Sequence, residues 1–126
     1  MLMCKKTNGT LVIDMGEKIV LGDEAYACTT TAKPMGPCAR SVVSVEAATE
    51  PSADGFVRYG DQVRLMSNPL IYHKKMYLHS QQCTPQIFAR FSRNQEVCMN
   101  TKANYNTCWT FVPPDGMGSP LIGTPV

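Results

Sequence analysis

Residues 58–65, RYGDQVRL, contain the pattern that decides the fold of this chain. Gly60 with the aspartate after it favours a turn, because both residue types are common where the backbone reverses. After this turn, Val63 and Leu65 alternate with polar residues, as they do in a strand that buries one face. We therefore predict a half-buried strand that is entered through a tight bend.

This strand belongs to a series of short β-like segments that occurs twice in the chain. The first series is formed by residues 2–4, 11–14, 26–28 and 39–45, and the second by residues 65–67, 76–79, 96–98 and 106–112. Matched positions lie between 63 residues apart (Leu2 and Leu65) and 70 residues apart (Cys28 and Cys98), so the series differ by small loop insertions. A repeat of this kind predicts a fold that is built from equivalent units.

Four short strands in each unit, without a helix of ordinary length, predict an all-β protein with a β-trefoil-like fold, of which about two of the three repeats are present. Residues 1–50 are the predicted first repeat, lacking its opening strand; residues 51–116 are the second; and residues 117–126 are the entry to a missing third repeat or a tail. Asp54-Gly55 and Asp115-Gly116 follow the fourth segment of each repeat and support these boundaries. Uncovered strand edges would favour assembly with a partner.

Composition is typical of one folded domain, with 126 residues, of which 44% are hydrophobic and 17% charged. No charge-free stretch approaches the roughly 20 apolar residues of a membrane-spanning helix. Residues 1–6 lack the pattern of an export signal, so we expect an intracellular protein. Free thiols are expected for the six cysteines, because Cys28, Cys98 and Cys108 lie in apolar segments. Trp109 is expected to be the main core residue of the last strand.

Charge is distributed unevenly along the chain, although the net charge is only +2. Residues 56–105 contain seven basic residues and two acidic ones, which gives +5, whereas residues 1–55 have a balance of −2. Such a basic segment suits an acidic partner, and it is equally typical of a solvated face.

Motifs for chemistry were sought and not found. His73, His79 and Cys83 match no zinc-binding spacing, and the chain has no nucleophile elbow and no phosphate-binding glycine loop. We therefore expect no enzyme, with no catalytic, cofactor-binding or metal-binding residues and no cofactor. Aromatic and basic residues interleave over residues 72–93, but core aromatics with solvated charges explain this pattern as well as nucleic-acid binding does. No nucleic acid, membrane or small-molecule substrate is expected as a partner.

Four segments together resemble the family of cilia- and flagella-associated protein 161. They are PCARSVVSVE (residues 37–46), GFVRYGDQVRL (55–65), MYLHS (76–80) and NTCWTFVPP (106–114). Members of this family belong to the ciliary axoneme, and their repeated fold is similar to MIR-type β-trefoil domains. The resemblance implies a structural microtubule inner protein on the luminal wall of ciliary or flagellar doublet microtubules, with the A-tubule as the expected location.

In that role the protein would contact tubulin and other microtubule inner proteins and stabilise the axoneme. The candidate partner contacts are basic residues of the second repeat, namely Lys74, Lys75, Arg90 and Arg93. The alternative is a MIR- or lectin-like β-trefoil module that binds a carbohydrate or another ligand. That alternative requires an exposed aromatic ring, whereas the structural role is compatible with a buried Trp109.

Overall fold

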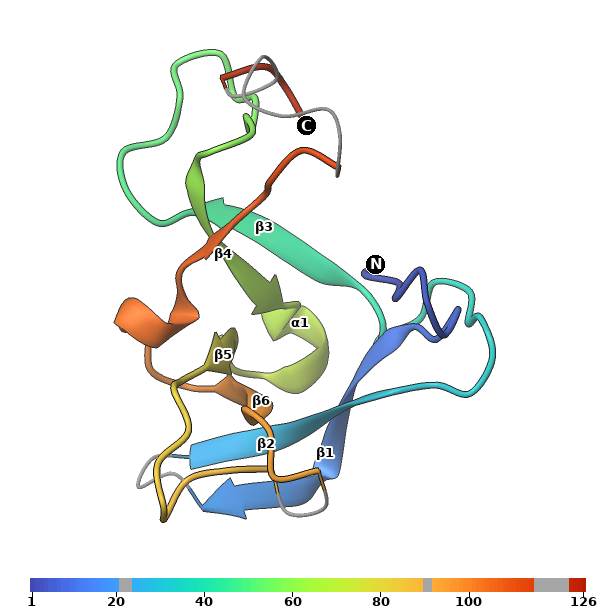
Figure 1. Ribbon diagram of the computed structural model, residues 1–126. Helices are drawn as coiled ribbons and strands as arrows, with labels where there is room; N and C mark the ends of the chain where they lie inside the picture. Colours follow the sequence, from blue (N-terminus) through green and yellow to red (C-terminus); the bar gives the residue numbers. More distant parts are fainter. Residues whose placement is uncertain (21–23, 90–91, 115–122) are drawn as a thin grey trace.

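The computed structural model describes residues 1–20, 24–89, 92–114 and 123–126 (Figure 1). These residues form β1 (Leu11–Val20), β2 (Glu24–Thr30), β3 (Val43–Ala47), β4 (Gln62–Ser67), α1 (Pro69–Tyr72), β5 (Tyr77–Ser80), β6 (Val97–Asn100), the 3-10 helix η1 (Tyr105–Thr107) and β7 (Trp109–Thr110). The strands make one sheet in the order β1-β2-β6-β5-β4-β3, with β7 paired to β4. The predicted all-β fold class is confirmed.

Strand β4 is paired along both of its edges. On one edge it pairs with β3 over five positions, from Val43↔Ser67 to Ala47↔Val63. On the other edge it pairs with β7 near its start and with β5 at Met66↔Tyr77. Val63, Leu65 and Ser67 are buried and the residues between them are less so, which confirms the alternation predicted for this segment.

The bend before β4 is fixed by local contacts. Gly60 adopts a φ of 96°, and the Oδ2 of Asp61 accepts a hydrogen bond of 2.9 Å from the backbone N–H of Arg58. The Arg58 guanidinium also pairs with Asp54 and holds the pKa of that carboxyl well below its usual range. Residues 123–126 lie against this segment through the bridge Arg58↔Pro125. The turn chemistry of the sequence is therefore used as predicted at Gly60-Asp61.

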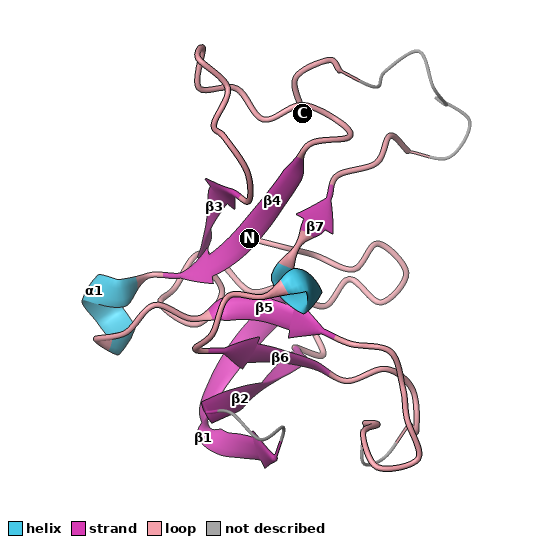
Figure 2. Cartoon of the chain, turned by 90° about the vertical axis from the view of Figure 1, so that its left-hand side faces the viewer, coloured by secondary structure: helices cyan, strands magenta, loops and turns pink. Residues whose placement is uncertain are grey.

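Two hairpins in the sheet have the same pairing register. Strands β1 and β2 pair from Leu11↔Thr30 to Asp14↔Ala27, and β5 and β6 pair from Tyr77↔Asn100 to Ser80↔Val97. Adding 66 to the positions in β1 and 70 to those in β2 gives the second set of pairs, the offsets that the sequence has at Val12/Leu78 and Cys28/Cys98. Figure 2 shows the two hairpins side by side, joined by the pairing of β2 with β6. The trefoil arrangement and the repeat boundaries stay predictions.

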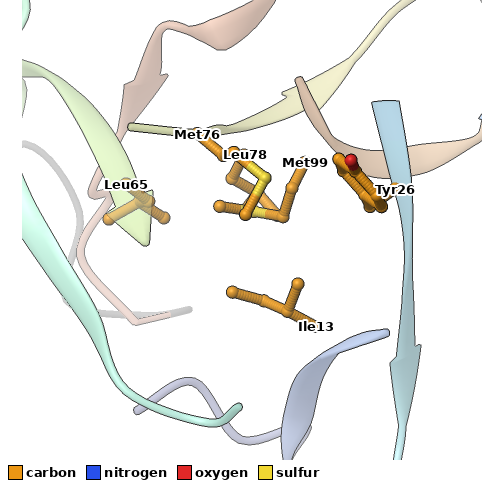
Figure 3. Close-up of a cluster of buried hydrophobic side chains, with 6 residues drawn as sticks. All are labelled: Ile13, Tyr26, Leu65, Met76, Leu78 and Met99. Atoms are coloured by element: carbon orange, nitrogen blue, oxygen red, sulfur yellow. The ribbon is translucent and has the colours of Figure 1, made fainter. Parts of the chain in front are cut away.

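The buried core lies where the two hairpins meet β4. Six of its side chains form one cluster, contributed by β1, β2, β4, β5, β6 and the residue before β5 (Figure 3): Ile13, Tyr26, Leu65, Met76, Leu78 and Met99. Each of these side chains is at most 5% exposed. The core therefore depends on contacts between both predicted repeats.

Three sequence expectations differ from the structure in detail. The predicted loop over residues 67–75 contains α1, because the side chain of Asn68 caps the helix and Pro69 occupies a first-turn position, where its missing N–H costs little. Trp109 packs at the rim of the core cluster and is only partly buried. His79 is 2% exposed, although its neighbours in the alternating pattern were expected to face the core in its place. Asp115-Gly116 lies outside the described residues.

Truncation of a core leucine tests this packing. Leu78 is 3% exposed, so Leu78→Ala should lower the free energy of unfolding by about 2–5 kcal/mol in urea denaturation. Leu70, on α1, is 86% exposed and provides the matched control, since Leu70→Ala should change the same quantity by less than about 0.5 kcal/mol. Equal effects of the two substitutions would contradict the assigned core.

Candidate functional site

Lys74, the first candidate contact, is bound within the protein. It follows α1, which ends at His73 with a left-handed φ of 57°. Its Nζ lies 2.6 Å from Glu24 Oε1 and donates a hydrogen bond of 3.2 Å to the Tyr26 hydroxyl. The ammonium group and the Tyr26 hydroxyl, as donors to Glu24, lower the pKa of this carboxyl. Lys74 therefore fastens the segment before β5 to β2.

Lys75, the next residue, forms a second internal ion pair. Its Nζ donates a hydrogen bond of 3.2 Å to Glu46 Oε1 on β3, and this contact raises the pKa of the lysine. An acidic partner would have to compete with Glu24 for Lys74 and with Glu46 for Lys75. Both pairs are partly solvated, so such competition is inexpensive.

Arg93 lies at the other end of β5, in the long connection from β5 to β6. It is exposed, its backbone is left-handed with a φ of 58°, and its guanidinium lies 5.4 Å from the centre of the Phe88 ring. Lys74 and Lys75 precede β5, whereas Arg93 follows it, so the structure does not gather these three cations into one patch. Arg90 lies outside the described residues.

A cavity of about 510 Å³ opens beside β7, and the sequence gave no direct indication of it. It is lined by residues from β4, β5, β6, η1 and β7 together with one residue of the β5–β6 connection: Gln62, Ser80, Gln95, Val97, Tyr105, Asn106, Cys108, Trp109 and Thr110. Trp109 is held in place because its Nε1–H donates a hydrogen bond of 2.8 Å to the carbonyl oxygen of Leu78. Tyr105, on the same rim, is 87% exposed.

Local capping explains how Tyr105 is presented. The side chain of Asn104 accepts a hydrogen bond of 2.9 Å from the N–H of Asn106, and the N–H of Asn104 donates one of 3.1 Å to Thr107 Oγ1. These reciprocal bonds fix the single turn of η1. The sequence signal is Asn104 followed three residues later by a threonine, which predicts a capped turn but not what the turn faces.

The cysteines are free thiols, as predicted, and all six lie in the described part of the chain. Cys98 is fully buried, and its Sγ lies 3.6 Å from Nδ1 of the buried His79. Burial raises the pKa of Cys98 to about 12, and burial with the neighbouring Cys98 raises the pKa of Cys28 to about 12. A thiol with such a pKa stays protonated at neutral pH, so the contact between Cys98 and His79 is a packing contact and not an activated nucleophile.

Within the described residues, no three side chains of His, Cys, Asp or Glu are grouped so that they could hold a metal ion. Among the same residues, no helix has both the length and the apolar character needed to cross a membrane. The chain matches no protein-family model, and a comparison with curated proteins also found no match.

The two buried thiols predict a fall in stability at alkaline pH. Unfolded cysteines titrate near pH 8.5, so between about pH 8.5 and 12 the unfolded chain releases protons that the folded chain retains. The free energy of unfolding should fall with pH over this range, by up to about 1.4 kcal/mol per pH unit for each thiol.

The slope of stability against pH, measured by urea denaturation, isolates the thiols from other titrating groups. The double variant Cys28→Ala/Cys98→Ala should have a shallower alkaline slope than the wild type. Cys83→Ala, which removes an exposed thiol, should leave the slope unchanged. Identical slopes in all three proteins would refute the assignment.

Proposed function

We propose that this protein is a non-enzymatic structural component of ciliary or flagellar doublet microtubules. In this proposal it binds the luminal wall, expected to be that of the A-tubule, where it contacts tubulin and other microtubule inner proteins and stabilises the axoneme. The resemblance of residues 37–46, 55–65, 76–80 and 106–114 to an axonemal family is its starting point.

One structural observation supports the proposal above others, because these four segments meet around a single strand. Residues 55–65 lead into and begin β4; the segment 37–46 supplies most of β3, on one edge of β4. The segments 76–80 and 106–114 supply β5 and β7, which pair with the other edge. Four stretches that are far apart in the sequence thus specify one block of the sheet, as expected if they derive from one fold and not from four unrelated matches.

The charge distribution indicates how such a block could contact an acidic lattice. Lys74 and Lys75 are already paired with carboxylates, so they contribute less to an encounter than their number suggests. Arg93 is exposed on the β5–β6 connection and its described contact is with an aromatic ring. Among the candidates whose positions are described, Arg93 is therefore the cation best placed to bind an acidic partner.

Retention in the axoneme tests the proposal. The tagged protein is expressed in cells with motile cilia, and isolated axonemes are extracted first with detergent and then with high salt. A luminal protein should remain with the doublets through both steps, and cryo-electron microscopy should show added density inside the doublet. Release of the whole protein with the detergent-soluble fraction would exclude the proposed location.

Reversal of the Arg93 charge tests the contact itself. Arg93→Glu should lower the doublet-bound fraction by about two- to fivefold, as expected for loss of an interaction of about 0.4–1 kcal/mol. Lys33→Glu makes the same charge change at another exposed lysine and should leave the bound fraction unchanged. If both variants bind as the wild type does, Arg93 is not a contact residue.

A further inference from the structure

The cavity beside β7 has the composition of a site for an uncharged, hydroxyl-rich ligand. Its volume of about 510 Å³ is within the range of small-molecule sites, about 300–1,000 Å³. Two aromatic residues, three side-chain amides and two hydroxyls are among its nine lining residues, and none of the nine carries a charge. We propose that this cavity binds a neutral saccharide, a function that does not depend on where the protein is located in the cell.

The aromatic residues provide the apolar part of such a site. One face of a sugar ring presents C–H groups, and these pack favourably against the face of an aromatic ring. Trp109 is already fixed by its pairing with Val63 in the sheet and by its hydrogen bond to Leu78, so little conformational entropy is lost when a ligand packs against it. Tyr105 is 87% exposed on a capped turn, an exposure for which packing within the chain offers no reason.

The amides provide the polar part. Gln62, Gln95 and Asn106 each carry two donors and one acceptor, and no hydrogen bond joins their side-chain amides to another described residue. Ser80 donates its hydroxyl proton to the carbonyl of Glu96 at 2.9 Å, which leaves its oxygen able to accept. Vicinal hydroxyls of a saccharide both donate and accept, so they match this mixture of groups.

Other ligand classes fit the cavity less well. A strongly charged ligand would find no opposite charge among the lining residues, and its desolvation would not be offset. An entirely apolar ligand would cover the amides and the hydroxyls without replacing their hydrogen bonds to water. A neutral saccharide satisfies both the aromatic and the amide groups.

The single tryptophan makes the experiment specific. Trp109 is the only tryptophan in the chain, so intrinsic fluorescence reports on this cavity alone. The full chain is titrated with glucose, galactose, mannose and N-acetylglucosamine, and with neutral oligosaccharides of each. We expect a saturable change in Trp109 emission with at least one of them, at millimolar or lower concentration.

Variants test whether the response comes from the cavity. Tyr105→Ala and Gln62→Ala should each weaken the affinity for that saccharide at least about tenfold, while thermal unfolding shows that both variants stay folded. Phe56→Ala removes another exposed aromatic residue, 58% exposed and absent from the cavity lining, and should not change the affinity.

Three results would overturn the proposal. One is the absence of a saturable response to any neutral saccharide in the folded protein. Another is wild-type affinity in the folded Tyr105→Ala and Gln62→Ala variants. The third is a response only to sulfated or acidic saccharides that disappears with added salt, since this would assign a polyanion-binding surface instead.

Discussion

The double-edged pairing of β4 is the constraint on which the rest of the structure depends. This six-residue strand holds β3 on one edge and both β5 and β7 on the other, and its buried face supplies Leu65 to the core cluster. A one-residue slip of β4 would exchange its buried and solvent-facing side chains along its whole length. The core, the position of Trp109 and the cavity beside it all follow from this register.

The sequence predicts what is local in this arrangement. Alternation at residues 62–65 gives the buried face of β4, and Gly60-Asp61 gives the bend before it. The equal offsets of the two series also match the register of the two hairpins, because a strand pair preserves its register when only its loop changes length. These features depend on backbone preferences and side-chain periodicity, which a sequence displays directly.

What the sequence does not predict depends on residues brought together from distant positions. The lysines at 74 and 75 look like a basic patch, yet Lys74 pairs with Glu24, 50 residues away, and Lys75 pairs with Glu46. His79 lies at an alternate position of a strand whose other face is also covered, so the rule of one buried face does not apply there. Burial of both faces is a tertiary property, and the pattern of β5 alone does not reveal it.

The origin of the cavity follows from the same edge of β4. Strands β5 and β7 both pair with this edge, but at different positions, and among the described residues no ladder joins them to each other. The hydrogen bond from Trp109 to the carbonyl of Leu78 bridges the two strands at this break, at the side of the cavity. A sheet edge that divides between two short strands must leave unpaired backbone or an opening that side chains line. Here the aromatic and amide side chains line it, which places ligand-binding chemistry at the least regular point of an otherwise paired sheet.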